Sequence, residues 1–217
     1  KVFLDEKDYF RFLHNLFEFN DTSPAINLYY KEAIFNQPQS YEVRLRKISK
    51  NRKPRKLLVN VLAFCLMPNH YHLLLEQLRT DGITEFMRKL GTGYTNYFNW
   101  RYKRDGVLFQ GKFKAVVLVN DSHFIHIPYY IHSNPLDLEF PEWRGGELKS
   151  YKDAVRSLEN YRWSSFPDYI GKESFPSVTQ REFLSKFFNG PASYKKEMSR
   201  WLKEKDLEEI KNLTLER

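Results

Sequence analysis

The sequence lacks the features that define several large protein classes. Its 217 residues include a single cysteine, Cys65, so neither a disulfide framework nor a cysteine-based zinc site can form within the chain. Cys65 lies in an apolar run, where a small buried side chain is expected. No apolar stretch approaches the roughly 20 residues of a membrane-spanning helix, and no signal-peptide pattern opens the chain. These absences predict a cytoplasmic protein without membrane contacts.

The composition that is present indicates a folded protein with polyanionic partners. Hydrophobic residues make up 41% of the chain, which is typical of a globular domain. Lysine and arginine number 35 against 27 acidic residues, and the net charge of +8 favours nucleic acid as a partner. Aromatic residues reach 17%, and rings interleaved with cations suit single-stranded nucleic acid because bases stack on the rings. The alternative for these rings is ordinary burial in the core.

Hydrophobic periodicity predicts an α+β fold. A first helix is expected from Asp5, a good N-cap, to about Asn20. Two Val- and Leu-rich runs joined by the turn Met67-Pro68-Asn69 predict a central hairpin. The strands of this hairpin are expected at 56–66 and 70–76. A third strand is expected at 113–119, and two more helices at 83–102 and 122–133. This order predicts an antiparallel sheet with helices packed on one face.

Two segments lie outside this pattern. Residues 21–55 contain breakers and then, from Arg44 onward, a strongly basic stretch. We interpret them as an insertion that is either a solvated loop or an arm that contacts phosphates. Residues 171–217 predict a helical C-terminal tail, with helical segments near 179–189 and 193–212.

The most informative short motif is His70-Tyr71-His72 on the second expected strand. Side chains alternate along a strand, so His70 and His72 point to the same face, about 7 Å apart along the backbone. Two imidazoles in this arrangement can share one divalent metal ion. The alternative is a pair of structural histidines.

A second pair of polar residues lies on the last helix of the pattern. Tyr130 and Asn134 are four residues apart, so they share one helix face. Asn134 offers an amide oxygen, a suitable third ligand for a hard cation. Tyr130 offers a phenolic oxygen that can attack phosphorus when a metal polarises the phosphate. The alternatives are a buried helix aromatic for Tyr130 and a helix C-cap before Pro135 for Asn134.

Basic residues cluster around the turn at Asp105-Gly106. The cluster comprises Arg101, Lys103, Arg104, Lys112 and Lys114. We expect several of them to contact nucleic acid phosphates. The alternative is a solvated surface without a partner.

Five segments together resemble a known family. They are M-P-N-H-Y-H-L-L-L at 67–75, Y-T-N-Y-F-N at 94–99, G-V-L-F-Q-G-K-F-K at 106–114, Y-I-H-S-N-P at 130–135 and Y-R-W-S-S at 161–165. In order and spacing they resemble the REP-associated tyrosine transposases, a group within the HUH single-tyrosine transposase superfamily.

The resemblance implies a ferredoxin-like antiparallel sheet and an HUH domain over residues 1–170. Family members begin with a strand that this chain lacks, and the insertion at 21–55 is longer than in compact members. The resemblance further implies that His70 and His72 bind Mg²⁺ or Mn²⁺ and that Tyr130 is the nucleophile. Asn134, which stands where other branches have glutamine, is implied as the third ligand.

The implied function is strand transfer on single-stranded or hairpin DNA through a 5′-phosphotyrosine intermediate, performed by a monomer or homodimer. Two rivals stay open. A catalytically silent DNA- or RNA-binding protein on the same fold would form no covalent adduct with DNA. A metal-dependent phosphoesterase that activates water would cleave DNA without an adduct, and Tyr130 would then be structural.

Overall fold

The structure, a computed structural model, describes residues 1–24, 54–119 and 121–204. Most of the expected insertion and the end of the tail lie outside the described residues. The elements, in chain order, are α1 (Glu6–Glu18), β1 (Val59–Met67), β2 (His70–Gln77), α4 (Gly82–Tyr102), α5 (Asp121–Ser133), η1 (Asn134–Leu138), η2 (Pro141–Gly145), α6 (Tyr151–Asn160), α7 (Phe166–Tyr169), α8 (Glu182–Phe187) and α9 (Pro191–Glu204). No helix in this part of the chain has the length and apolar character needed to span a membrane.

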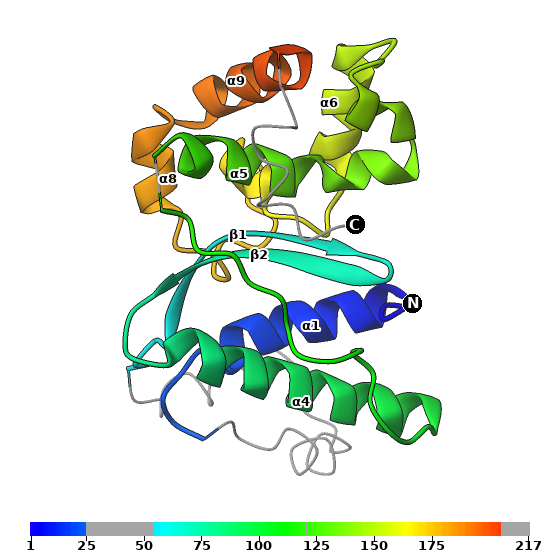
Figure 1. Ribbon diagram of the computed structural model, residues 1–217, viewed down its shortest axis with the longest axis vertical. Helices are drawn as coiled ribbons and strands as arrows, with labels where there is room; N and C mark the ends of the chain where they lie inside the picture. The colour runs from blue at the N-terminus through cyan, green and yellow to red at the C-terminus, as the bar shows by residue number, and fades with distance from the viewer. Residues whose placement is uncertain (25–53, 120, 205–217) are drawn as a thin grey trace, which may run out of the picture.

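The antiparallel hairpin of β1 and β2 lies between two layers of helices (Figure 1). α1 and α4 lie on one side, and α5 packs on the other with α6, α8 and α9 beyond it. The α+β class is therefore confirmed, but the expectation that helices cover only one face is wrong. The reason lies in β1, in which every residue except Asn60 is buried. A strand that is apolar on both faces has to be covered on both.

A bulge in β1 distributes its side chains between the two layers. Val61 pairs with Leu75 and Ala63 pairs with Leu74, so Leu62 is an extra residue that shifts the alternation by one. The core toward α1 and α4 receives Val59, Val61, Phe64 and Leu66, and the core toward α5 receives Leu62, Ala63, Cys65 and Met67. One strand thus seals two hydrophobic cores, and Cys65 is buried as expected.

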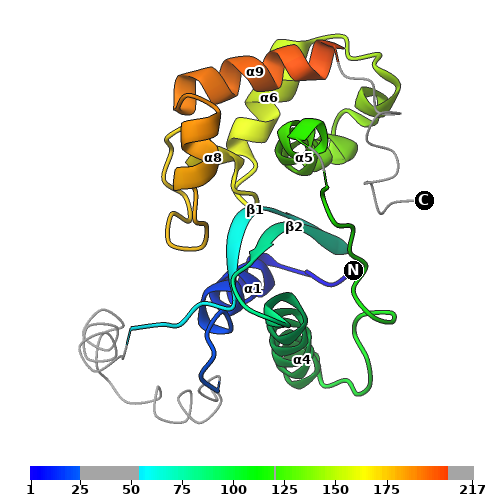
Figure 2. The same cartoon turned by 60° about the vertical axis from the view of Figure 1, so that its left-hand side comes forward.

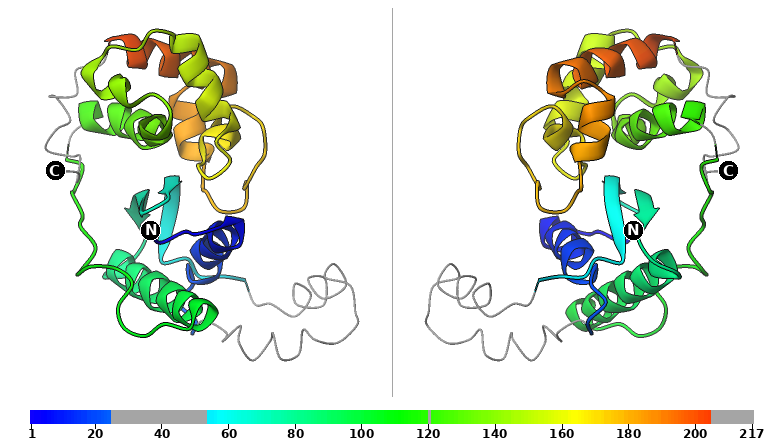
Figure 3. Two further views of the ribbon diagram at one scale, coloured as in Figure 1. Left: turned by 90° about the vertical axis from the view of Figure 1, so that its right-hand side faces the viewer. Right: turned by 90° about the vertical axis from the view of Figure 1, so that its left-hand side faces the viewer.

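The third strand expected at 113–119 is not formed. This segment has no regular hydrogen-bonded structure and passes on the β2 side of the hairpin on its way to α5 (Figures 2 and 3). Val117 and Val119 are 78% and 81% exposed. The Val-rich pattern suits a strand, but a strand also needs a neighbour for its main-chain hydrogen bonds. Within the described ranges the sheet consists of β1 and β2, so a full ferredoxin-like sheet is not observed.

The outer edge of β1 is closed by residues that follow α6. Leu66 N–H donates to the Trp163 carbonyl, and Ser165 N–H donates to the Phe64 carbonyl. Near the start of β1, the side chain and main chain of Gln180 form two further bonds with the strand. These contacts satisfy main-chain groups that a third strand would otherwise have to pair.

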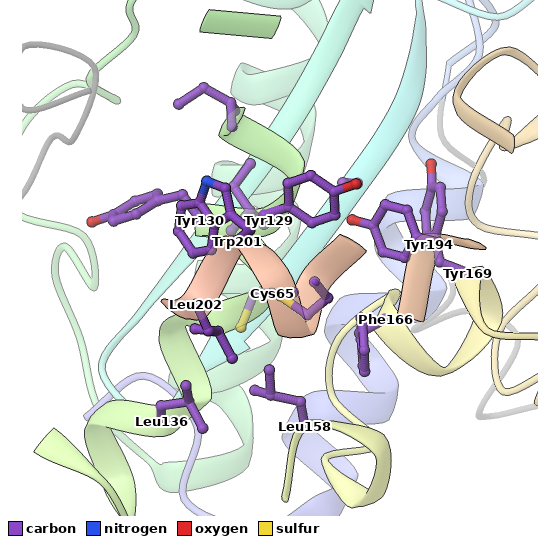
Figure 4. Packing of buried hydrophobic residues seen from close by; sticks show 14 of the residues in the cluster. Cys65, Tyr129, Tyr130, Leu136, Leu158, Phe166, Tyr169, Tyr194, Trp201 and Leu202 are labelled. Atoms are coloured by element: carbon purple, nitrogen blue, oxygen red, sulfur yellow. The ribbon is translucent and has the colours of Figure 1, made fainter. Parts of the chain in front are cut away.

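The C-terminal tail packs into the α5-side core. The tail contributes to that core Leu184, Tyr194, Met198, Trp201 and Leu202. Figure 4 shows Trp201, Leu202 and Tyr194 beside residues of α5 and β1. The two helices expected in the tail are present as α8 and α9, and α8 is shorter than its pattern predicted.

Candidate active site

The two histidines of β2 lie on the α5 side of the hairpin. The pleat turns His70 and His72 toward α5 and turns Tyr71 toward α1, where its ring contacts Phe12. The Nε2 atoms of His70 and His72 are 3.0 Å apart, and the two rings are nearly perpendicular. The expectation that both imidazoles share one face and one small volume is borne out by this geometry.

The histidine pair fits a divalent cation. Neighbouring ligands at right angles and about 2.1 Å from a metal lie about 3 Å apart, which matches the Nε2 separation. His70 Nδ1 lies 2.8 Å from Asn69 Oδ1. An amide oxygen only accepts, so this bond places the proton on Nδ1 and leaves a lone pair on Nε2. Within the described residues no third His, Cys, Asp or Glu joins the pair, so further ligands would be amide oxygens, water or DNA.

Tyr130 reaches the histidine pair from α5. This helix packs across both strands. The Tyr130 ring lies edge-on to His72 with 6.2 Å between ring centroids, and it also contacts Trp143. Only 3% of Tyr130 is exposed. The fold therefore brings Tyr130 into one cluster with His70 and His72, although Tyr130 follows them by about 60 residues in the sequence.

The two other tyrosines that compete for the nucleophile's role are core residues. Tyr129 and Tyr130 point in different directions from α5 in Figure 4, as expected for neighbours that are about 100° apart on a helix. Tyr129 stacks on Tyr194 with 5.0 Å between ring centroids, and burial raises its pKa. Tyr94 lies in the opposite layer, where its hydroxyl donates to the Val2 carbonyl and burial likewise raises its pKa.

A buried histidine anchors α5 to the hairpin. His132 forms hydrogen bonds of 2.7 Å with Tyr194 Oη and with Ser165 Oγ. Ser165 Oγ in turn accepts from the Phe64 N–H of β1. Burial lowers the pKa of His132 to about 3, so the ring is neutral and structural. This chain of bonds ties α5 to β1 and so helps to position Tyr130.

Asn134 is fully buried at the junction of α5 and η1. Its Nδ2 donates to the carbonyl oxygens of Tyr130 at 2.9 Å and Ile131 at 3.4 Å, which closes the end of the helix. Its Oδ1 accepts a bond of 3.2 Å from Arg144. An amide oxygen has two lone pairs, so this bond leaves one for another partner.

Arg144 of η2 is a member of the cluster that sequence reasoning did not identify. Its Nη1 donates to the Tyr130 hydroxyl at 3.2 Å. Arg144 lies nine residues beyond the Y-I-H-S-N-P segment, in a Pro- and Gly-containing stretch without periodicity. Nothing in that local sequence distinguishes it from the many other cations of the chain.

The basic cluster around the turn at 105–106 divides into two groups. Arg101 forms ion pairs with Asp5 and Asp8, which tie the end of α4 to α1. Arg104 Nη2 donates to the Val107 carbonyl. The three lysines of the cluster are exposed, namely Lys103, Lys112 and Lys114. The exposed lysines are thus the members best placed to meet a polyanion.

Comparison with known proteins identifies the family. A family model described as "Transposase IS200 like" matches residues 26–134, just over half of the chain. No curated protein and no solved structure matches the chain. The matched range includes His70, His72 and Tyr130, the side chains that the fold brings together. The chain therefore belongs to the family of IS200-like transposases and carries an HUH-type transposase domain.

Proposed function

We propose that this transposase cleaves and rejoins single-stranded DNA with Tyr130 as its nucleophile. The observation that carries the proposal is the convergence of three side chains: the Nε2 atoms of His70 and His72 lie 3.0 Å apart, and the Tyr130 ring lies against His72. A metal-binding pair beside a phenolic oxygen suits nucleophilic attack on phosphorus. Tyr130 lies against His72, whereas Tyr129 stacks on Tyr194 and Tyr94 lies on the opposite side of the hairpin, which supports Tyr130 over both.

The proposed step conserves the phosphodiester energy. Tyr130 Oη forms a bond to phosphorus while the P–O3′ bond of the DNA breaks, which gives a 5′-phosphotyrosine and a free 3′ end. The phenolic proton leaves to solvent, and the departing 3′ oxygen takes up a proton from solvent. When Mg²⁺ or Mn²⁺ is bound on His70 and His72, it polarises the phosphate and offsets the developing charge. A DNA 3′-OH then displaces Tyr130 Oη and rejoins the strand.

Asn134 is proposed as a third, amide-oxygen ligand for that ion. The support is its place at the end of α5, one turn from Tyr130, with one lone pair of Oδ1 left after the bond from Arg144. Because His70, His72, Tyr130 and Asn134 belong to one chain, a monomer is sufficient to assemble the site. A homodimer is the alternative assembly.

We assign the chain to the REP-associated group on the five segments quoted above, and we propose hairpin-containing DNA as its substrate.

The ferredoxin-like sheet is proposed on two observations. The main-chain groups of Tyr71, Leu73 and Leu75 face away from β1, with no main-chain partner among the described residues. The Val-rich segment 113–119 passes on the same side of the hairpin. A further strand between the outer edge of β2 and segment 113–119 would form main-chain hydrogen bonds with both.

The proposed function is tested with a pool of single-stranded DNA hairpins and Mn²⁺. We expect a protein–DNA species that survives denaturation, together with a released strand that ends in a 3′-OH. Cleavage without a covalent species would instead identify a phosphoesterase that activates water. Binding without cleavage would identify a catalytically silent DNA-binding protein.

A further inference from the structure

Arg144 is held rigidly by an acidic residue outside the matched family range. Its Nε donates to Asp137 Oδ1 at 2.8 Å and its Nη2 donates to Asp137 Oδ2 at 2.6 Å, a paired geometry that fixes the plane of the guanidinium. Trp143 Nε1 also donates to Asp137 Oδ1, at 2.6 Å, and so fixes the carboxylate. The arginine side chain has therefore lost most of its freedom before any ligand binds.

The opposite edge of the same guanidinium faces the proposed nucleophile. Nη1 donates to Tyr130 Oη and Nη2 donates to Asn134 Oδ1, each at 3.2 Å. The guanidinium carbon lies 5.7 Å from the centre of the Tyr130 ring. A fixed cation thus joins the phenolic oxygen to the amide oxygen of Asn134.

We infer that Arg144 is a catalytic residue of the strand-transfer site, where its guanidinium holds Tyr130 Oη in position and stabilises the negative charge on this oxygen and on the phosphate. The inference rests on the proposed function, because it requires Tyr130 to be the nucleophile. Arg144 transfers no proton, since a guanidinium stays protonated in proteins.

The role of Arg144 applies to both halves of the reaction. During attack, the Tyr130 O–H bond breaks as the bond to phosphorus forms, and the cation opposes the negative charge on the phenolic oxygen. During rejoining, Tyr130 Oη is the leaving group, and its bond to phosphorus breaks as the incoming 3′ oxygen binds phosphorus. A phenolate that leaves beside Nη1–H is stabilised by a charge-assisted hydrogen bond.

Exposure indicates how DNA meets this cation. The Arg144 side chain is 34% exposed, whereas Tyr130 is 3% exposed. Arg144 therefore offers a partly solvated surface next to a nearly buried nucleophile. A phosphate that contacts the guanidinium is brought beside Tyr130 Oη, and guanidinium geometry is well suited to phosphate oxygens.

The competing interpretation is that Arg144 only ties η2 to η1 through Asp137. The two interpretations differ in what a charge-conserving variant does. A purely structural tie depends on the paired bonds to Asp137, which lysine cannot reproduce. A catalytic cation depends on positive charge beside Tyr130 Oη, which lysine restores in part.

The test measures the single-turnover rate of covalent adduct formation with a DNA hairpin and Mn²⁺, together with DNA affinity and thermal stability. Arg144→Met should lower the maximal rate by roughly 10²–10³-fold while most of the DNA affinity is kept, and Arg144→Lys should recover part of the rate. The matched control is Arg200→Met, which removes an exposed arginine paired with Glu197 on α9 and should leave the rate unchanged. If Arg144→Met is unstable, the double variant Asp137→Asn/Arg144→Met also removes the carboxylate charge that loses its arginine partner.

Two results would overturn the inference. If the unaltered protein forms an adduct and folded Arg144→Met or the double variant forms it at the same rate, Arg144 is not catalytic and the proposed function survives. The same conclusion follows if Arg144→Lys is as slow as Arg144→Met although both are folded. If the unaltered protein forms no adduct with any DNA, the proposed function fails and the inference fails with it.

Discussion

The two faces of the hairpin differ in what they do with polar groups. On the α1 and α4 face, the carboxylate of Asp8 accepts bonds from the Tyr97 and Tyr102 hydroxyls and from Arg101, so these polar atoms satisfy one another. On the α5 face, the Nε2 atoms of His70 and His72 point at each other. The first arrangement is a network of hydrogen bonds with a structural role. The second is a pair of nitrogen atoms placed so that both could bind one cation.

Adjacent residues of β2 illustrate the same division. Tyr71 enters the aromatic core beside Phe12, and burial raises its pKa to about 12. His72, the next residue, lies beside Tyr130 on the other face. β2 therefore contributes to core packing on one side and to the proposed active site on the other, and each side can be perturbed separately.

The largest expected effect comes from removing the hydroxyl of Tyr130, the proposed nucleophile. Tyr130→Phe deletes one oxygen and keeps the ring that packs on His72 and Trp143, so DNA binding should survive. Adduct formation should fall by on the order of 10³-fold or more, since no other nucleophile is positioned. Denaturing gels of the protein–DNA mixture measure the adduct. Tyr129→Phe is the matched control and should cleave normally, and the reverse pattern would transfer the role to Tyr129.

Removal of either histidine of the proposed metal-binding pair should give the next largest loss. His70→Ala and His72→Ala should each lower the cleavage rate by roughly 10²-fold or more, because several kcal/mol of charge stabilisation are lost. A chelator should have a similar effect on the unaltered protein, reversed by Mn²⁺. Tyr71→Phe, between the two histidines but on the other face, serves as the control. Full cleavage by both histidine variants would show that His70 and His72 do not form a metal site that cleavage requires.

A substitution on the α1 and α4 face of the hairpin should lower the stability of the fold and leave DNA cleavage intact. Phe12 of α1 is fully buried against Tyr71 of β2 and Tyr94 of α4. Phe12→Ala should lower the free energy of unfolding by about 3–5 kcal/mol, measured by urea denaturation. Molecules that remain folded at low temperature should cleave at the normal rate per active site. A defect in cleavage at full folding would show that the two faces are coupled.

The smallest effect is expected from the exposed lysines near the turn. Replacing Lys103, Lys112 and Lys114 with alanine should weaken DNA binding at every sequence and lower the slope of log affinity against log salt by about 0.7 per lost phosphate contact. Titrations at several salt concentrations measure this slope. The control variant carries alanine at three other lysines, Lys172, Lys186 and Lys196. An unchanged slope in the first variant would identify its lysines as solvated surface.

The parts of this fold that depend on local sequence could be predicted, and the parts that depend on distant partners could not. The H-x-H alternation fixed the common face of His70 and His72, and the four-residue spacing linked Tyr130 to Asn134. The pattern at 113–119 failed because strand formation depends on a neighbouring strand. Arg144 was missed because its role arises from η2 folding back on η1, which leaves no periodic signal.

The most direct test of the proposed mechanism is to locate the covalent bond between protein and DNA. The covalent species formed with hairpin DNA and Mn²⁺ would be digested with protease and nuclease, and the modified peptide would be sequenced by mass spectrometry. The proposed mechanism predicts a nucleotide attached through its 5′ phosphate to Tyr130. A nucleotide on any other residue, or a cleaved strand with no modified peptide, would contradict it.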